Sequence, residues 1–237
     1  MRFQSIQQKR KSEVIEYDST FFDAARHRAV PVAFYAPGGG KRSLRKIVIF
    51  NHGYGRNQPG SNKQYAYLTR ALASRGYFVA SIQHELPTDD TIPTTGNLYQ
   101  SRLPFWQRGV ANILFVLDKL RAQQPELDYG SVAVVGHSNG GDMAMLLARD
   151  YSSRVHKVIS LDNRRVPLPR TRQPRVYSLR GNDFPADPGV LPTAEEQTQF
   201  AITIVALPDV KHGEMDDKAN EHQRRAINRY LLRFLRE

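Results

Sequence analysis

The sequence predicts an α/β fold, in which a mostly parallel β-sheet carries helices on both faces. At 237 residues, 40% of them hydrophobic, the chain is long enough for one large domain with a sizeable core. Short apolar runs alternate along it with segments in which apolar residues recur every three or four positions, and strands that alternate with helices are typical of this fold class. No apolar run approaches the roughly 20 residues of a membrane helix, so we expect no stable membrane insertion.

The candidate strands are of two kinds. Six are short, continuously apolar runs, which are typical of strands buried on both faces of a parallel sheet. Two earlier segments, residues 13–17 and 30–35, are candidate edge strands. The six apolar runs are residues 46–50, 77–82, 131–135, 157–161, 175–179 and 201–207.

Helical patterns lie between these strands. Ser61 and Asn62 are candidate caps of a first helix, which Gly76 is placed to end. A second pattern begins at Trp106 and stops at Pro125, and a last one covers residues 226–235. The apolar faces comprise Tyr65, Leu68 and Leu72 in the first helix, Val110, Ile113, Leu114, Leu117 and Leu120 in the second, and Ala226, Ile227, Tyr230, Leu231, Phe234 and Leu235 in the last.

No repeat or linker divides the chain, so residues 1–237 are expected to form a single domain. The segment 85–104 fits neither pattern, because it carries three prolines and little apolar periodicity. Long irregular segments in compact domains are usually flexible or part of a functional site. We expect a loop excursion or small cap here. Tyr99, with Phe105 and Trp106 just beyond the segment, is a candidate wall of a substrate pocket.

The charge balance and the absence of cysteine limit the classes of partner and of catalytic nucleophile that are expected. Lys and Arg number 34 against 23 Asp and Glu, a net charge of +11 that could attract nucleic acid or anionic lipid. The excess is scattered and no nucleic-acid-binding motif accompanies it, so we expect no nucleic-acid partner. Without cysteine, any covalent nucleophile must be oxygen or nitrogen. The start of the chain lacks the apolar segment of a secretion signal, so a cytoplasmic location is expected.

Ser138 is the candidate nucleophile. It lies in GHSNG, residues 136–140, where an apolar strand turns directly into an apolar helix. In a strand-to-helix turn of the form G-x-S-x-G, the glycines permit close backbone packing and the strained turn exposes the hydroxyl. The helix that begins there points its amide groups at negative charge developing beside the hydroxyl. A helix cap would need neither glycine, so the pattern favours a nucleophile.

A serine nucleophile needs an imidazole base and a carboxylate that orients it. His212 is the candidate base, because it lies in a short polar loop after the last apolar run. Asp183, which follows a predicted strand, is the favoured acid, since the three residues then have the chain order Ser, Asp, His. Asp187 in the same loop and Asp162 at the end of the preceding strand remain alternatives.

A glycine-rich turn supplies the candidate oxyanion hole. NHGYG, residues 51–55, directly follows an apolar run, and its glycines allow a sharp turn. We expect the Tyr54 amide to point into the site beside the amide of Asn139, the residue after Ser138. Such donors stabilise the charge on a carbonyl oxygen under attack. No phosphate-binding glycine motif and no HExxH motif is present, so no cofactor and no metal are expected.

From Arg26 onward the chain resembles serine α/β-hydrolases, through its HGYG, GHSNGG and GNDFPAD segments and the His212 loop. The stretch DAARHRAVPVAFYAP is similar to the entry segment of bacterial hydrolases related to platelet-activating-factor acetylhydrolases, chlorophyllases and dienelactone hydrolases. Dienelactone hydrolases proper use a cysteine nucleophile, which this chain lacks. The resemblance implies an α/β-hydrolase fold with a mostly parallel eight-stranded sheet and cofactor-free ester hydrolysis. It also implies Ser138, Asp183 and His212 as the catalytic triad.

The leading hypothesis is a carboxylic-ester hydrolase that acts through an acyl-enzyme on small-molecule esters of short to medium acyl chain. His84 and Arg164 are further candidate substrate-binding residues. Arg164 and Arg165 follow the carboxyl end of a strand, where α/β sheets bind ligands, and they suit an anionic part of a substrate. A serine peptidase or amidase with the same triad is one alternative, and a catalytically silent binding module is another. The chain retains all three triad candidates, which favours an enzyme.

Overall fold

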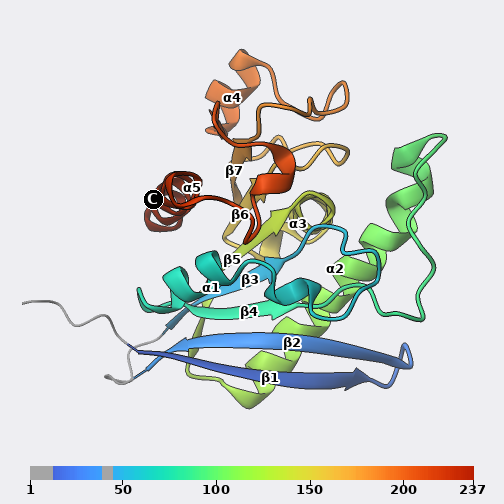
Figure 1. The fold of residues 1–237 in the computed structure, drawn as a ribbon, viewed down its shortest axis with the longest axis vertical. Helices are drawn as coiled ribbons and strands as arrows, with labels where there is room; N and C mark the ends of the chain where they lie inside the picture. Colours follow the sequence, from blue (N-terminus) through green and yellow to red (C-terminus); the bar gives the residue numbers. More distant parts are fainter. Residues whose placement is uncertain (1–12, 39–44) are drawn as a thin grey trace, which may run out of the picture.

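The computed structural model describes residues 13–38 and 45–237 (Figure 1). Within them, eight strands form one sheet in the order β1-β2-β4-β3-β5-β6-β7-β8. β2 pairs antiparallel with β1 and with β4, and every other pairing is parallel. The predicted mostly parallel, eight-stranded sheet is confirmed. The strands are β1 Val14–Asp23, β2 Arg28–Pro37, β3 Arg45–Asn51, β4 Phe78–Ile82, β5 Leu127–His137, β6 Lys157–Leu161, β7 Arg175–Arg180 and β8 Thr203–Ala206.

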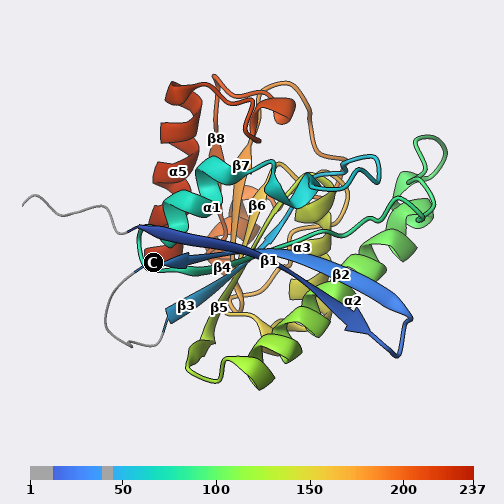
Figure 2. The same cartoon turned by 60° about the horizontal axis from the view of Figure 1, so that its bottom comes forward.

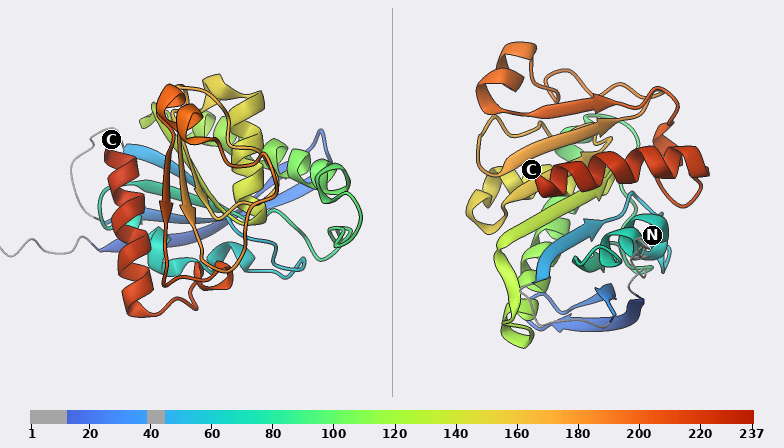
Figure 3. Two further views of the ribbon diagram at one scale, coloured as in Figure 1. Left: turned by 90° about the horizontal axis from the view of Figure 1, so that it is seen from above. Right: turned by 90° about the vertical axis from the view of Figure 1, so that its left-hand side faces the viewer.

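Helices cover both faces of the sheet (Figures 2 and 3). α2, Leu98–Gln123, and α3, Asn139–Asp150, lie together on one face, whereas α1, Ala66–Ala73, and α5, Glu221–Arg236, lie on the other. A short helix, α4, Ala194–Phe200, precedes β8.

The sheet therefore separates two apolar cores. In β5, Val134 belongs to the core beneath α2 and α3, and its neighbour Val135 belongs to the core beneath α1 and α5. All residues of β4 and β6 are buried. Because both faces of these strands are covered, their sequences are continuously apolar rather than alternating.

The irregular segment is shorter than predicted. α2 begins at Leu98, where the Asn97 side chain accepts a hydrogen bond from the Gln100 amide, and the helix contains Pro104. Pro104 is exposed, so water can satisfy the carbonyl group that loses its amide partner there. Tyr99 and the two aromatic residues after Pro104 therefore lie on a helix.

The first helix also begins later than its caps suggested. Ser61 and Asn62 lie in a 3-10 turn, Ser61–Lys63, and α1 starts at Ala66. Gly76 follows the helix with a φ of +96°, a conformation that glycine adopts readily, so the predicted end is confirmed.

The start of the chain, on which the expected cytoplasmic location depends, lies mostly outside the described residues. None of the helices in the described part is long and apolar enough to cross a lipid bilayer.

The carboxyl ends of β3, β5, β6 and β7 meet at one edge of the sheet (Figure 1). Parallel sheets bind their ligands at this edge. The segments that leave these strands are those in which the sequence predicts the turn at residues 51–55, the nucleophile and the candidate acids.

Gly136 packs so closely against α3 that a side chain there should destabilise the protein. A Cβ atom at Gly136 would lie 2.1 Å from the Gly140 carbonyl oxygen, whereas one at Gly130, also in β5, would meet only the Asp128 carboxylate at 3.4 Å. Gly136→Ala should lower the free energy of unfolding by about 2 kcal/mol or more, and Gly130→Ala should change it by about 0.5 kcal/mol or less. Urea unfolding followed by circular dichroism measures both, and equal effects would contradict the close packing.

Candidate active site

Ser138 occupies a strained turn between β5 and α3. Its backbone has φ 52° and ψ −118°, a left-handed φ for a residue with a side chain, and it forms the N-cap of α3. A Cβ atom at Gly140 would lie 2.3 Å from the Asn51 carbonyl oxygen, so α3 begins directly against the end of β3. The predicted strand-to-helix turn at Ser138 is confirmed.

Three side chains from separate loops form a hydrogen-bonded chain. His212 Nδ1 donates to Asp162 Oδ2 at 2.6 Å, so Nε2 is the acceptor nitrogen, and it lies 2.9 Å from Ser138 Oγ. His212 begins a 3-10 turn after β8, and Asp162 directly follows β6. The Asp162 side chain is fully buried. This is the geometry of a base oriented by a carboxylate.

The prediction that Asp183 orients the His212 imidazole is wrong. Asp183 Oδ1 accepts a hydrogen bond from the backbone amide of His212 at 2.6 Å, and the ring is held by Asp162. Asp187 does not hold it either, and its own amide donates to the Arg164 carbonyl oxygen. Asp162 reaches the ring because β6 pairs directly with the strand that leads to the nucleophile, whereas Asp183 leaves β7, one strand farther out.

Asp162 is stabilised as a buried carboxylate. Its Oδ1 accepts the Gly181 amide at 3.1 Å and forms an ion pair with Arg180 at 2.9 Å. Burial alone would raise the pKa of Asp162, but the hydrogen bond from His212 and the charge of Arg180 outweigh it and hold that pKa below its usual value. An ionised carboxylate stabilises the positive charge that an imidazole acquires when it takes a proton.

A buried relay ties the His212 loop to the turn after β3. His137 Nε2 donates to the His212 carbonyl oxygen at 3.0 Å, and its Nδ1 accepts from the Tyr65 hydroxyl at 2.7 Å. The Tyr65 oxygen in turn accepts the Gly53 amide at 3.0 Å. Burial, aided by the neighbouring His212, lowers the pKa of His137 to about 3, so the ring stays neutral and each hydrogen bond keeps its direction.

The two predicted oxyanion donors lie on segments that side chains hold in place. The Tyr54 hydroxyl accepts a hydrogen bond from the Ile92 amide at 3.4 Å. The Asn139 side chain accepts from Trp106 Nε1 at 2.7 Å and donates to Glu85 Oε1 at 2.9 Å. Within the described residues, the backbone amides of Tyr54 and Asn139 have no acceptor of their own. Their role as donors to a substrate stays a prediction.

Two of the predicted substrate-binding residues are instead structural. His84 is 1% exposed and its Nε2 donates to Asn51 Oδ1, while Trp106 is fully buried and bonds Asn139. Buried rings with internal partners cannot contact a substrate, which corrects the prediction for both. Tyr99 and Phe105 are half-buried on the first turns of α2.

Three arginines gather beside the triad. The Arg164 guanidinium carbon lies 3.9 Å from the centroid of the Phe184 ring, and that ring lies 5.9 Å from the His212 ring. Burial, together with the charge of Arg165, lowers the pKa values of Arg164 and of Arg102. Arg102 Nε donates to a carbonyl oxygen of the preceding loop. In the described part of the chain, none of the three forms an ion pair with a carboxylate.

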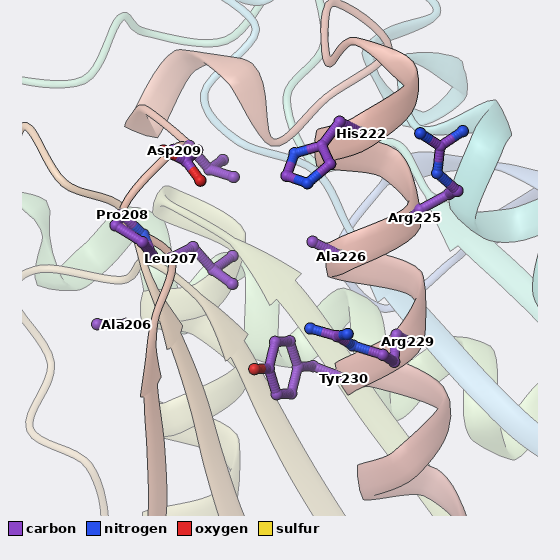
Figure 4. Close-up of a pocket in the computed structure, with 10 residues that line it drawn as sticks. Ala206, Leu207, Pro208, Asp209, His222, Arg225, Ala226, Arg229 and Tyr230 are labelled. Atoms are coloured by element: carbon purple, nitrogen blue, oxygen red, sulfur yellow. The ribbon is translucent and has the colours of Figure 1, made fainter.

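A surface cavity lies apart from the triad, between the end of β8 and α5 (Figure 4). Its volume is about 570 Å³, and Leu207, Arg229 and Tyr230 are among the residues that line it. It touches the site only through Asp209 and Val210, in the loop that leads to His212. The described residues contain no group of three acidic or histidine side chains that could hold a metal ion.

Sequence reasoning missed three residues of this site. The sequence pattern assigns Tyr65 only to the apolar face of a helix, and no pattern marks Arg180, which lies at the end of a strand. Glu85 carried a usable signal, because a carboxylate that directly follows a buried strand reaches the ligand-binding edge of the sheet. Its partner is 54 positions away in the chain, so the sequence alone could not identify it.

The His137 relay predicts a histidine that does not titrate in the usual range. Because its pKa is lowered from 6.5 to about 3, the unfolded chain binds one more proton between these values. Stability should therefore be present in full above pH 6.5 and fall as the pH drops toward 3. Nitrogen-15 NMR of the histidine rings should show His137 protonated only on Nε2 down to about pH 4. Titration of His137 near pH 6.5 would contradict the relay.

Comparison with known proteins identifies the fold and the family of this chain. The family model of the alpha/beta hydrolase fold matches residues 46–191. No curated protein matches the sequence at a significant level. A bacterial heroin esterase superposes with a TM-score of 0.67 at 15% identity, covering 94% of this chain and 84% of its own. A fungal esterase of Rhizomucor miehei superposes with a TM-score of 0.64 at 14% identity, covering 95% of this chain and 84% of its own. A dienelactone hydrolase-like promiscuous phosphotriesterase from metagenomic libraries superposes with a TM-score of 0.63 at 19% identity, covering 92% of this chain and 95% of its own.

These solved structures are too distant in sequence to show more than a shared fold. The family model is different, because it matches more than half of the chain and spans both the turn after β3 and the nucleophile turn. The chain belongs to the α/β-hydrolase family.

Proposed function

We propose that this protein is a serine hydrolase that cleaves carboxylic esters through an acyl-enzyme intermediate. The observation that carries the proposal is the hydrogen-bonded chain from Ser138 through His212 to Asp162, with distances of 2.9 and 2.6 Å. A serine hydroxyl is a weak nucleophile unless a base stands within hydrogen-bond reach. The strained turn at Ser138 places the hydroxyl beside that base.

His212 acts as the base and then as the acid. Its Nε2 takes the proton of Ser138 as Oγ attacks the ester carbonyl carbon, and the resulting imidazolium is stabilised by the Asp162 carboxylate. The same nitrogen protonates the departing alcohol. It then takes a proton from water, which attacks the acyl-enzyme and releases the acid.

The negative charge on the carbonyl oxygen is received by the Tyr54 and Asn139 amides. Asn139 is the first residue of α3, so the positive end of that helix adds to the stabilisation. Each donor of this kind is worth on the order of 100- to 1,000-fold in rate.

We propose esters rather than amides as substrates, because two of the solved structures with this fold are described as esterases. We assign the acyl group a short to medium length. To the apolar wall that sets this length we assign Tyr99 and Phe105, two half-buried aromatic residues on the first turns of α2.

The unpaired arginines favour esters that carry a second, anionic group. The Phe184 ring lies between Arg164 and His212, and Arg165 and Arg102 add like charge. Asp142, Asp162 and Asp187 act on Arg164 from nearby, but in the described residues none of the three arginines forms an ion pair with a carboxylate. Guanidinium groups bind carboxylate and phosphate through charge-assisted hydrogen bonds. A substrate with a free carboxylate would relieve this local excess of charge.

Turnover of p-nitrophenyl butyrate tests the triad. Ser138→Ala should reduce kcat by about 10,000-fold or more, because no other group replaces the nucleophile. Asp162→Asn should reduce it by about 100- to 10,000-fold through loss of imidazole orientation. Asp183→Asn is the matched control and should cost about tenfold or less, since Asp183 holds only the backbone of His212. Circular dichroism confirms folding; near-normal turnover in folded Ser138→Ala, or a larger loss in Asp183→Asn than in Asp162→Asn, would contradict the assignment.

A pair of esters of equal length tests the arginines. The double variant Arg164→Gln, Arg165→Gln should raise KM at least about tenfold for p-nitrophenyl hemiglutarate, which carries a carboxylate, and leave KM for neutral p-nitrophenyl valerate nearly unchanged. Arg225 is exposed on α5, at a distance from the site, so Arg225→Gln serves as the control for a change in net charge. An equal change in KM for both esters would disprove an anion subsite.

A further inference from the structure

Glu85 is a buried acid that the proposed reaction does not use, although it contacts both segments that carry the oxyanion donors. It is 2% exposed and lies just after β4. Oε1 accepts a hydrogen bond from the Asn139 side chain at 2.9 Å, and Oε2 lies 3.6 Å from His52 Nε2. His52 is two residues before Tyr54, and Asn139 follows the nucleophile. One carboxyl group therefore spans the two halves of the oxyanion hole.

The hydrogen bonds of His52 fix where its proton lies. Its Nδ1 faces the Gly53 carbonyl oxygen at 2.6 Å, so Nδ1 must be the donor. Its Nε2 receives the backbone amide of His84 at 3.0 Å, so Nε2 must be the acceptor. A proton on Nε2 would point at the hydrogen of that amide. His52 is therefore the neutral imidazole, and the lone pair of its Nε2 is occupied by the His84 amide.

This assignment decides the state of Glu85. Because Nε2 carries no proton, His52 cannot donate to Oε2, and in the described residues Oε2 has no other hydrogen-bond donor to compensate an ionised carboxylate. A buried anion without a donor is strongly unfavourable. A protonated Glu85 removes this charge, and its Oε2 keeps its contact with the His52 ring at 3.6 Å from Nε2. Burial also raises the pKa of Glu85, opposed in part by the charge of Arg108.

The surrounding groups keep the network neutral. Asn51 Nδ2 donates to the Val135 carbonyl oxygen, so its Oδ1 is the acceptor for His84 Nε2. His84 Nδ1 is buried without a hydrogen-bond partner in the described residues, and burial lowers the pKa of His84 well below its usual value, so this ring is neutral as well. The ionised groups that face Glu85 come from other elements: Arg108 from α2, and Asp89, which is paired with Arg28 of β2.

We propose that Glu85 is a positioning residue that keeps its proton at neutral pH and, as a neutral acid, locks the His52 turn to the Asn139 segment. The role rests on the proposed ester hydrolysis, because these segments matter as donors to the carbonyl oxygen. Ionisation of Glu85 would place a charge between them and loosen the two amides relative to Ser138. The consequence falls on kcat rather than on substrate binding.

Two substitutions of Glu85 distinguish the effect of a neutral, hydrogen-bonding side chain from the effect of side-chain volume. Glu85→Gln keeps a neutral group of similar shape that can accept from Asn139 and contact His52, whereas Glu85→Leu keeps most of the volume without the hydrogen bond. At pH 7, Glu85→Gln should retain kcat for p-nitrophenyl butyrate within about threefold, and Glu85→Leu should lose about 10- to 100-fold in kcat with little change in KM. Wild type should lose kcat at alkaline pH as Glu85 ionises, and Glu85→Gln should not show this loss.

Infrared spectroscopy reads the proton directly and does not depend on turnover. Wild type at pH 7 should show the C=O band of a protonated carboxyl group, which disappears in Glu85→Gln and persists in Glu221→Gln, an exposed control on α5. The pKa of Glu85 is raised in the folded state, so the folded protein holds this proton at a pH where the unfolded chain has released it. Stability is therefore lost as the pH rises, and the melting temperature of wild type should fall below that of Glu85→Gln.

The outcomes are distinguishable. If no protonated-carboxyl band depends on Glu85, or if Glu85→Gln is as impaired as Glu85→Leu, the proposal is overturned while ester hydrolysis stands. If folded wild type hydrolyses no ester, the proposed function fails and the positioning role fails with it. Retained turnover in Glu85→Gln, together with the band, supports both.

Discussion

The hydrogen bond from the His212 imidazole to buried Asp162 is the interaction on which the rest of the site depends. It joins the loop after β8 to the end of β6, so it fixes that loop against the sheet. It also sets the tautomer that leaves Nε2 free to face Ser138. Arg180 and the Gly181 amide hold the carboxylate from behind, and without them burial would favour its neutral form.

Two neutral networks flank this charged centre. One joins Gly53, Tyr65 and His137 to the backbone of His212, and the other joins His52, Glu85 and Trp106 to Asn139. Polar groups are costly to bury unless they are hydrogen-bonded. Their concentration beneath one edge of an otherwise apolar sheet is explained if they hold the nucleophile, base and amides in one fixed arrangement, because preorganised dipoles need not rearrange during reaction.

The parts of this site that could be predicted from the sequence are those that depend on neighbouring residues in the chain. The turn at Ser138 depends on glycines two positions away, and the continuous apolar strands depend on burial of both faces. The choice between Asp162 and Asp183 depends on which strands pair, which no local pattern encodes. His84 and Trp106 were misassigned for the same reason, since their partners Asn51 and Asn139 lie 33 positions away in each case. The start of α2 is not predicted because the three prolines and weak periodicity of residues 85–104 indicate an irregular segment, although the exposed Pro104 lies within the helix.

Covalent labelling tests the account most directly, because it reports the reactivity of one hydroxyl and needs no knowledge of the substrate. A fluorophosphonate reacts with a serine only when a neighbouring base activates it. Incubation of wild type with the probe, followed by peptide mass spectrometry, should give a single adduct on Ser138 at full stoichiometry, and Asp162→Asn should slow its formation by about 100-fold or more. No adduct on folded wild type, or an adduct on another serine, would contradict the account.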